Sequence, residues 1–305
     1  GESIYNYLQV KNLSDRTILS TNVLFGVQSV TMKDKGLTGM YYDTALAAPA
    51  LADNANSALI LGMGTGTYAR QLKQYYPKMN ITGVEIDQKI TDLAGEYFDE
   101  PADIPVTTYD GRAWLAASHD KYDVIMVDAY QDITIPFQMS STEFFTMVRE
   151  HLNPGGVMVV NMNMISDGQG SINEALSDTI ASVFGNGNTL TADVPNTTNR
   201  ELFAKKPGSG SEENSMQQAS KALNLRETTY ERTGSEDLEW YMEEVASRFR
   251  KVNEPDSAST ILTDDKAPVE VLGMHAIDQI IADEAGPYRQ ILKDEGFGGL
   301  LRAVQ

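Results

Sequence analysis

The sequence of 305 residues contains no cysteine and only three histidines. The absence of cysteine excludes disulfides and thiolate zinc sites. The histidines, His119, His151 and His275, are widely spaced, which argues against a histidine-based metal cluster, and we expect no metal cofactor. Any catalytic chemistry is therefore expected to depend on carboxylates, hydroxyl groups and tyrosines.

Long apolar runs are also missing. No stretch approaches the ~20 apolar residues that a membrane-spanning helix needs, and the start of the chain lacks the basic and apolar regions of a signal peptide. The chain opens on Gly1 instead of Met, so we expect that sequence upstream is missing. We predict a cytoplasmic location for this portion, with tethering to a membrane through upstream sequence as the alternative.

Basic residues are in the minority. The sequence has 24 Lys and Arg and 43 Asp and Glu, which gives a formal net charge of −19. Nucleic-acid binders normally present a basic face, so we expect no nucleic-acid partner. Two explanations of the acidic excess stay open. One is solubility, and the other is a field that attracts cationic substrates.

A regular succession of strands and helices is present after the first 36 residues. Apolar runs such as SALILGMG and YDVIMVDAY alternate with amphipathic runs such as TYARQLKQYYP. This alternation predicts a mostly parallel sheet with helices on both faces. TLTADV and RELFAKK follow each other without a helix between them, which predicts a terminal hairpin. The fold class is therefore α/β, of the class I methyltransferase-like Rossmann type.

Composition divides the chain into four predicted parts. Residues 1–36 alternate short β-rich runs with turn residues, which predicts a small N-terminal β unit. Residues 37–206 are predicted to form the Rossmann-like domain. Residues 207–215, PGSGSEENS, have the composition of a flexible linker, and residues 216–305 are predicted to be a helical region.

The stretch LILGMGTGTYARQL, residues 59–72, joins an apolar strand to a helix through a glycine-rich turn. Glycines at the carboxyl end of a strand let a ligand approach the backbone, and the following helix supplies free N–H groups. Thr67 stands where the dinucleotide fingerprint has its third glycine, which favours an adenosyl ligand over a pyrophosphate. The predicted binding residues of the loop are Gly62, Gly64, Thr65 and Gly66.

Carboxylates end three of the predicted strands. Glu85 lies 21 residues after Gly64, where a carboxylate can accept both ribose hydroxyls. Asp110 is placed to accept from an adenine amino group, and Asp128 ends YDVIMVDAY. Each acid alone could cap a helix or form a turn. Three of them in register with a glycine loop predict an adenosyl-cofactor site in one crevice.

The motifs occur in an order that resembles the spermidine synthase-like family of polyamine aminopropyltransferases. The matching segments are ESIYNYLQV, LTGMYYD, LILGMGTGTYARQL, VEID, YDGRAWL and YDVIMVDAY. The resemblance covers about residues 2–206, and LTDDKAPVE, residues 262–270, resembles the tail of bacterial members. Some members carry a membrane-spanning region ahead of the synthase-like domain, so a membrane domain upstream stays open. Members are commonly homodimers, and we expect a homodimer by analogy.

The resemblance implies a transferase of polyamine biosynthesis. Such an enzyme moves an aminopropyl group from decarboxylated S-adenosylmethionine to a small amine, and methylthioadenosine leaves. The resemblance implies Glu85 as the ribose ligand, with Asp110 and Gly111 as the adenine contacts. Asp128 matches the acid that accepts the proton of the amine, and Tyr42 matches an aromatic position of the polyamine channel.

The sequence departs from the family pattern at two acidic positions. Thr65 stands where the glycine loop of the family carries an acid that grips the aminopropyl ammonium, and Gln131 replaces a second acid after Asp128. One charge pair near 4 Å is worth about 4 kcal/mol at a surface-like dielectric, so Thr65 puts selectivity for the decarboxylated cofactor in question. The candidate substrate-binding residues are Tyr42, Asp43, Tyr130 and Asp132.

Two other functions stay open on the same residues. One is an S-adenosylmethionine-dependent methyltransferase that acts on a small molecule, and the other is a non-catalytic domain that binds an adenosyl ligand. DAYQDITIPF, residues 128–137, is predicted to be a gate over the acceptor pocket because it directly follows the strand-end acid. Asp264 and Asp265 are predicted to cap and dock a helix rather than to take part in chemistry.

Overall fold

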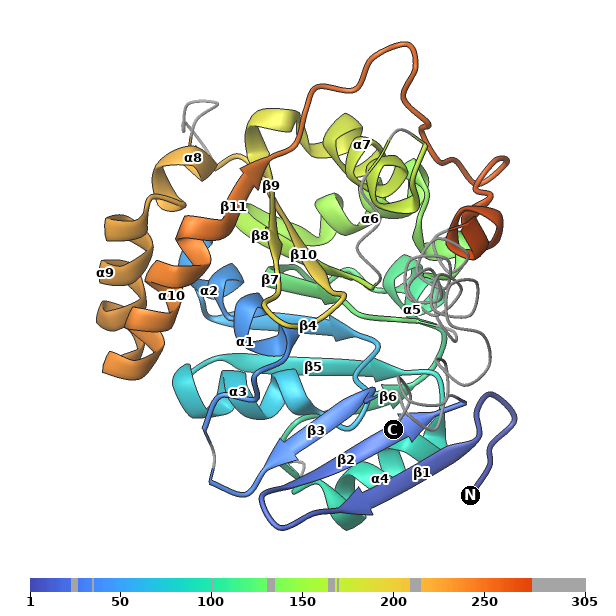
Figure 1. Ribbon diagram of the computed structural model, residues 1–305, viewed down its shortest axis with the longest axis vertical. Helices are drawn as coiled ribbons and strands as arrows, with labels where there is room; N and C mark the ends of the chain where they lie inside the picture. The colour runs from blue at the N-terminus through green and yellow to red at the C-terminus, as the bar shows by residue number, and fades with distance from the viewer. Residues whose placement is uncertain are drawn as a thin grey trace, which may run out of the picture.

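An eight-stranded sheet forms the centre of the computed structural model (Figure 1). The structure describes residues 1–22, 27–34, 36–99, 101–130, 135–163, 168, 170–208 and 215–275. The strands of the main sheet are β4 (Ser57–Leu61), β5 (Asn80–Glu85), β6 (Val106–Thr108), β7 (Tyr122–Val127), β8 (Leu152–Met162), β9 (Thr189–Asp193), β10 (Arg200–Lys205) and β11 (Phe249–Lys251).

The strand order is β11-β9-β10-β8-β7-β4-β5-β6. Strands β4 to β8 pair in parallel, whereas β10 pairs antiparallel with both β8 and β9. This arrangement confirms the predicted methyltransferase-like Rossmann fold with its terminal hairpin. β11 pairs antiparallel with β9 and comes from the part of the chain for which only helices were predicted. That C-terminal region therefore extends the main sheet.

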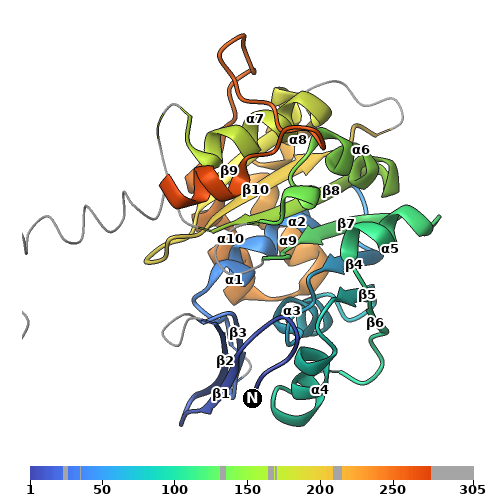
Figure 2. The ribbon, with the colours of Figure 1, turned by 90° about the vertical axis from the view of Figure 1, so that its right-hand side faces the viewer.

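Helices cover both faces of the sheet (Figures 1 and 2). They are α1 (Tyr41–Ala45), α2 (Ala47–Leu51), α3 (Thr67–Tyr75), α4 (Gln88–Tyr97), α5 (Gly111–Ala117), α6 (Thr142–His151), α7 (Ile172–Phe184), α8 (Ser215–Ala219), α9 (Ala222–Thr233) and α10 (Glu236–Arg248), with short 3-10 turns at Phe137–Met139 and Asn186–Asn188. Ala58 and Ile60 of β4 pack with α1–α3 and α8–α10, and Leu59 and Leu61 pack with α5–α7. The continuous apolar strands are thus buried on both faces, as a parallel sheet requires.

Side-chain caps begin helices α4, α5 and α6 of the main domain, whereas α3, which follows β4, starts after Gly66 without one. Asp87 accepts from a backbone N–H at the start of α4, Asp110 does so for α5, and Ser141 does so for α6. These caps satisfy N–H groups that have no partner inside the helix. Asp87 and Asp110 each lie two residues after a strand, so the starts of α4 and α5 follow from short polar residues near strand ends, whereas Ser141 follows the 3-10 turn Phe137–Met139.

A second, antiparallel sheet is formed by β1 (Leu8–Asn12), β2 (Arg16–Thr21) and β3 (Ser29–Met32), which confirms the predicted N-terminal β unit. Leu8 and Leu19 of this sheet pack against Ile90 and Phe98, in α4 and directly after it. Thr67 at the start of α3 hydrogen-bonds both backbone groups of Val30, at 2.8 and 3.1 Å. The small sheet is therefore held beside the glycine loop.

Besides the pairing of β11, hydrogen bonds and ion pairs hold the C-terminal part on the main domain. Arg232 of α9 donates to the carbonyl groups of Ala52 and Asp53 at 3.0 and 3.1 Å, just after α2. Asp264 accepts from Arg112 of α5 at 2.7 and 2.5 Å and from Ser141 at 2.5 Å, which agrees with its predicted docking role. All but the first residue of the predicted helix HAIDQIIADEAGPYRQIL (275–292) and most of the predicted linker lie outside the described residues, and the domain boundaries stay predictions.

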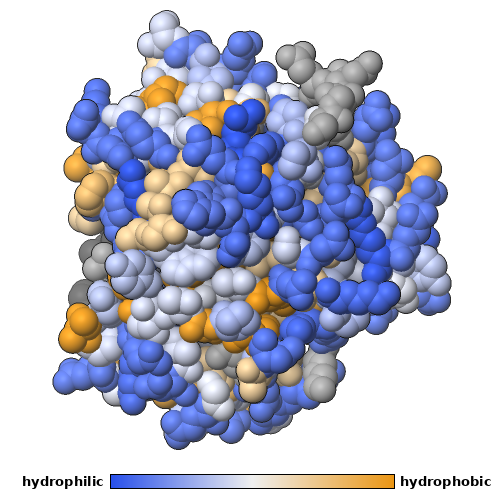
Figure 3. Space-filling view, turned by 180° about the vertical axis from the view of Figure 1, so that it is seen from behind, coloured by the Kyte–Doolittle hydropathy of each residue, from blue (hydrophilic) through white to orange (hydrophobic). Residues whose placement is uncertain are grey.

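The surface seen from behind is hydrophilic over most of its area, with smaller apolar patches between polar side chains (Figure 3). Every helix that the described residues form is too short or too polar to span a membrane.

Candidate active site

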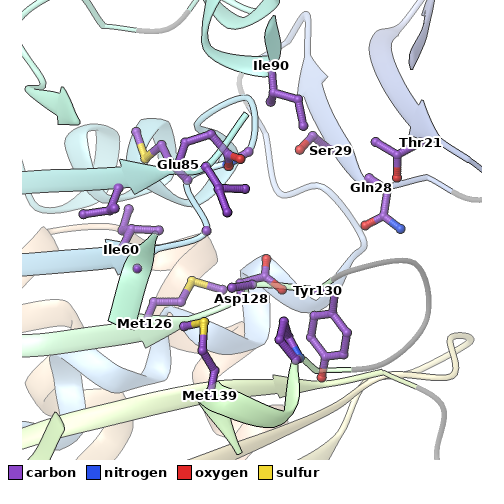
Figure 4. Close-up of a pocket in the computed structure, with 18 of the residues that line it drawn as sticks. Thr21, Gln28, Ser29, Ile60, Glu85, Ile90, Met126, Asp128, Tyr130 and Met139 are labelled. Atoms are coloured by element: carbon purple, nitrogen blue, oxygen red, sulfur yellow. The ribbon is translucent and has the colours of Figure 1, made fainter. Parts of the chain in front are cut away.

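A pocket lies at the carboxyl ends of β4, β5 and β7, between the main sheet and the small N-terminal sheet (Figure 4). Residues from the main-sheet side include Gly62, Gly64, Glu85, Asp110, Gly111, Asp128 and Tyr130. Residues from the other side include Leu19, Thr21, Gln28 and Ser29 of β2, β3 and the segment before β3. The crevice outside the strand ends is where open α/β sheets bind ligands, so the pocket lies where the sequence predicts a site.

Two glycines of the loop are needed for chain packing. Gly62 has φ of +88°, and a Cβ there would lie 2.4 Å from the carbonyl oxygen of Asp128. Gly64 has φ of +56°, and its Cβ would lie 2.9 Å from the Oγ of Ser29. The first glycine therefore lets the ends of β4 and β7 meet, and the second lets the small sheet approach the loop.

Thr65 and Gly66 are not among the described residues that line the pocket. Thr65 is 0% exposed, and its N–H group points to the Oγ of Ser29 at 3.3 Å. Gly66 is the residue directly before α3, with φ of +78°. Thr65 and Gly66 therefore belong to the part of the loop that faces away from the pocket, whereas the backbone of Gly62 and Gly64 lines it.

Asp43 also lies outside the described pocket lining. It is 1% exposed, and one of its oxygens accepts from the N–H and hydroxyl groups of Thr38 at 2.9 and 2.8 Å and from Gln71 at 2.5 Å. The other oxygen accepts from the N–H of Gly39 at 2.7 Å. The Asp43 carboxylate therefore fixes the turn before α1, and the structure does not bring it to the predicted substrate site.

Glu85 is held at the pocket wall by backbone donors. Its Oε2 accepts from the N–H of Gly64 at 2.8 Å, and its Oε1 accepts from the N–H of Asp87 at 3.0 Å. Burial raises the pKa of Glu85, and these backbone hydrogen bonds oppose the rise. Each carboxylate oxygen can accept more than one hydrogen bond, so both keep acceptor capacity for a ligand.

Asp110 combines the two roles that the sequence left open. Its Oδ1 accepts from the N–H of Ala113 at 2.8 Å and so caps α5. Asp110 also lines the pocket, together with the adjacent Gly111. A carboxylate that caps a helix with one oxygen still has a second oxygen that can accept from a ligand.

Asp128 receives side-chain donors from two other elements. Its Oδ2 accepts from the hydroxyl of Tyr41 at 2.6 Å, and its Oδ1 accepts from the Nδ2 of Asn161 at 2.9 Å. Burial raises the pKa of Asp128 to about 7, the charge of Glu85 adds to the rise, and the two hydrogen bonds oppose it. Burial and the nearby charge of Glu85 thus favour the protonated form of Asp128, and its two hydrogen-bond donors favour the ionised form.

Tyr41 is a site residue that sequence reasoning missed. The hydroxyl of Tyr42, the predicted channel residue, donates instead to the carbonyl oxygen of Gln28 at 2.7 Å. Both tyrosines line the pocket, with ring centroids 4.0 Å apart. Burial raises the pKa of Tyr41 well above its usual value, so its hydroxyl stays a donor to Asp128. The tyrosine pair itself is a signal in the sequence, but only the packing of α1 decides which ring meets the carboxylate.

Asn161 was also missed, although its position follows from strand pairing. β7 and β8 run in parallel with Val127 opposite Val160, so the next residues, Asp128 and Asn161, are neighbours at the strand ends. The signal was a polar residue directly after the buried run VMVV. Parallel neighbours bring residues at equal strand-end positions together.

Tyr130 lines the pocket, where the sequence predicts it. Its hydroxyl forms hydrogen bonds with the backbone of β8 and of the segment directly after β8. The hydroxyl donates to the carbonyl oxygen of Asn161 and accepts from the N–H of Asn163 at 3.0 Å. Asp132 and Gln131 lie outside the described residues, as does the centre of the predicted gate.

The charge of the pocket is one-sided. Glu85, Asp110 and Asp128 contribute carboxylates, and the described lining contains no lysine, arginine or histidine. Such a lining attracts cations and repels anions. Within the described part of the chain, no group of three or more acidic or histidine side chains could hold a metal ion.

Fold and site together define a methyltransferase-like α/β protein with an acidic ligand pocket at its strand ends. Residues 40–206 match the spermine/spermidine synthase domain, and the chain belongs to this family. The polyamine aminopropyltransferase of Corynebacterium efficiens is 37% identical over 131 residues, which cover 39% of this chain and 25% of that protein. The chain spans less than two thirds of the length of this relative and of two other curated polyamine aminopropyltransferases that it matches.

Solved structures show the same fold. The probable spermidine synthase from Corynebacterium glutamicum has a TM-score of 0.59 at 21% identity, and the match covers 86% of this chain and 97% of that one. Human methyltransferase-like protein 13 in complex with SAH has a TM-score of 0.51 at 21% identity, over 65% and 95% of the two chains. At these identities the likeness establishes the fold and leaves the ligand to be argued from the site.

Proposed function

We propose that the protein transfers an aminopropyl group from decarboxylated S-adenosylmethionine to a small amine, as a transferase of polyamine biosynthesis. The observation that carries this proposal is the environment of Asp128. Its carboxylate, with a pKa of about 7, lines a pocket with tyrosines and two further carboxylates and with no cationic side chain in the described lining. Membership of the spermine/spermidine synthase family supports the same reaction.

The adenosyl side of the pocket is assigned to the loop and the first two carboxylates. Glu85 is fixed by backbone donors and keeps acceptor capacity for ribose hydroxyls. Asp110 and Gly111 line the pocket at the start of α5, where they can contact the adenine. Gly62 and Gly64 present the backbone of the loop to the same ligand. When bound, decarboxylated S-adenosylmethionine supplies a sulfonium-activated carbon.

The acceptor side is assigned to Asp128. Its carboxylate binds the ammonium of the acceptor and takes one proton, which leaves a neutral nitrogen with a free electron pair. That nitrogen forms a bond to the activated carbon as the carbon–sulfur bond breaks, and methylthioadenosine leaves with the sulfur electron pair. Tyr41 and Asn161 donate to the ionised form of Asp128 and keep it ready to accept the proton.

The charge of the lining bears on the choice of cosubstrate. Carboxylates without a compensating cation favour an ammonium tail and oppose the carboxylate tail of intact S-adenosylmethionine. Methyl transfer from the intact form is the second candidate, because Thr65 places no acid in the glycine loop. The side chain of Thr65 is fully buried, so we assign discrimination to the lining carboxylates rather than to this position.

Parallel calorimetric titrations with S-adenosylmethionine, its decarboxylated form and methylthioadenosine test the proposal, followed by incubation with diamines and product detection. We expect binding of the decarboxylated form and methylthioadenosine, and a new amine product. Preference for the intact form would support methyl transfer. Tight binding without turnover of any amine would indicate a ligand-binding domain, and no binding would refute the adenosyl site.

Assembly and location stay predictions: the homodimer and the upstream membrane domain follow from the family resemblance, and the cytoplasmic location follows from the sequence. A homodimer is expected, and light scattering of the purified protein measures it. The cytoplasmic location and a membrane domain upstream are tested by fractionating cells that express the complete native protein.

A further inference from the structure

A chain of two asparagine side chains leads to Asp128 from the hairpin between β9 and β10. The Nδ2 of Asn199 donates to the Oδ1 of Asn161 at 2.9 Å. The Nδ2 of Asn161 then donates to the Oδ1 of Asp128 at 2.9 Å. A carboxamide has one acceptor end and one donor end, so a donor placed at the oxygen of Asn161 directs its NH₂ group toward Asp128.

The alternative orientation of Asn161 would be unfavourable for the ionised Asp128. A half-turn of the amide would place its oxygen against the carboxylate, with acceptor facing acceptor. Asn161 is only 3% exposed, so solvent has little access to replace the lost donor. In the observed structure, Asn199 opposes this half-turn because the turned amide would present NH₂ to the NH₂ of Asn199.

The hairpin fixes Asn199 independently of the pocket. The N–H of Asn199 donates to the Oγ1 of Thr197 at 3.1 Å, and its carbonyl oxygen accepts from the N–H of Val194 at 3.0 Å. Asn199 itself is not among the described pocket-lining residues. Its side chain therefore reaches the pocket only through Asn161.

We propose that Asn199 is a positioning residue that holds the Asn161 amide with its NH₂ group on Asp128 and so keeps the proton acceptor ionised. The proposal rests on the role of Asp128 given above. Asn199 contacts neither substrate nor reacting atoms in this scheme, and its effect on the reaction passes through one hydrogen bond.

Other groups also act on the proton affinity of Asp128. The titratable or hydrogen-bonding groups that face it or sense its charge are Tyr41, Tyr42, Glu85, Tyr130, Asn161 and Glu201. Among the described residues, Tyr41 and Asn161 are the two whose side chains donate hydrogen bonds to the Asp128 carboxylate. Substitution of Asn199 leaves the Tyr41 bond and the charges of the acids in place, so a change in the pKa of Asp128 reports on Asn161.

The test is a double-mutant cycle of Asn199→Leu and Asn161→Leu. The pKa of Asp128 is read from the side-chain carboxyl signal of ¹³C-aspartate-labelled protein, which Asp128→Asn identifies by its loss. Each single substitution is expected to raise this pKa by about one unit, because a donor to the charged form is lost. The double variant is expected to match Asn161→Leu. An unchanged pKa in Asn199→Leu, or a full additional rise in the double variant, would overturn the proposal.

Two controls keep the result interpretable. Thr198→Val changes an exposed residue of the same hairpin and is expected to leave the pKa of Asp128 unchanged. Asn199→Asp offers only acceptors to Asn161 and is expected to raise the pKa at least as far as Asn199→Leu; a smaller rise would contradict the orientation argument. Circular dichroism and thermal unfolding establish that each variant is folded.

The activity readout is kept separate from the titration. In Asn199→Leu, the ascending limb of the plot of kcat/KM against pH is expected to shift to higher pH by the same number of pH units as the pKa of Asp128. Absence of aminopropyl transfer in the unmodified protein would refute the proposed function, while the carboxyl titration would still decide the role of Asn199.

Discussion

The two sides of the pocket hold their carboxylates in different ways. Glu85, on the cofactor side, accepts from the backbone N–H groups of Gly64 and Asp87. Asp128, on the acceptor side, accepts from the side chains of Tyr41 and Asn161. Both carboxyls are buried enough that their pKa values are raised.

This difference separates a rigid binding group from an adjustable chemical group. The backbone donors are set by the paths of the glycine loop and of the turn after β5, and a change of side chain does not remove an N–H group. Side-chain donors come from α1 and β8, and each can be removed alone. We infer that Glu85 suits the recognition of fixed ribose geometry, whereas the proton affinity of Asp128 can be tuned by its two partners.

Asp128→Asn is expected to have the largest effect. General-base catalysis typically contributes about 10²–10⁴-fold, so turnover is expected to fall by that range, while affinity for methylthioadenosine changes little. Product formation and calorimetry on the same preparation measure the two quantities. Turnover equal to that of the unmodified protein would remove Asp128 from the mechanism. The contrast between a binding role for Glu85 and a chemical role for Asp128 would then be refuted.

Glu85→Gln is expected to act on binding instead. Loss of charged hydrogen bonds to the ribose is expected to weaken methylthioadenosine binding by roughly 10–100-fold. The same substitution removes a charge that raises the pKa of Asp128, so the ascending limb of kcat/KM is expected to move to lower pH. Asp103→Asn, in an ion pair with Lys73, is the control. Unaltered nucleoside affinity in Glu85→Gln would refute its role as ribose ligand.

Tyr41→Phe is expected to lower kcat/KM at neutral pH by about tenfold, since one donor to the charged acceptor is lost. The unmodified protein should show activity that rises with pH through about 7, because Asp128 must be ionised to accept a proton. In Tyr41→Phe, this rise in activity should shift to higher pH. Tyr42→Phe is the matched control, because its hydroxyl donates to Gln28. Equal shifts in both variants would show that the Tyr41 hydrogen bond is not the cause.

Glu201→Gln is expected to have the smallest effect on activity and to act on stability instead. Glu201 lies opposite Asn161 in β10, is 0% exposed and has no hydrogen-bond partner for its carboxyl among the described residues. Burial raises its pKa well above 4.5. The folded state therefore keeps a proton that the unfolded state releases above about pH 4.5, and this group lowers the free energy of unfolding by about 1.4 kcal/mol per pH unit up to its folded pKa.

Glutamine does not ionise, so Glu201→Gln is expected to become more stable than the unmodified protein as pH rises. Urea unfolding at pH 5, 6, 7 and 8 measures the difference between the two curves. A constant difference across this range would show that Glu201 is not protonated in the folded state. This outcome requires no shift in the ascending limb of kcat/KM against pH, which keeps the stability effect distinct from the catalytic one.

Local patterns in the sequence predicted the sheet and the acids at its strand ends. The alternation of apolar strands and amphipathic helices predicted the parallel sheet, and Glu85, Asp110 and Asp128 end strands whose carboxyl ends meet at the pocket. The same patterns did not predict that Asp43 and Thr65 are buried away from the pocket lining. The direction of a polar side chain near a turn depends on which donors the fold places around it.

The sequence by itself determined the succession of strands and helices in the Rossmann-like domain, the glycine loop and the acids at strand ends, because these depend on residue types and spacings within single segments. Only the tertiary structure decided that Tyr41, rather than Tyr42, meets Asp128. It also brought Asn161 and Asn199 into one chain of hydrogen bonds across β7, β8 and the β9–β10 hairpin. These contacts join residues that are far apart in the chain, and strand register and helix packing place them to within a hydrogen-bond length.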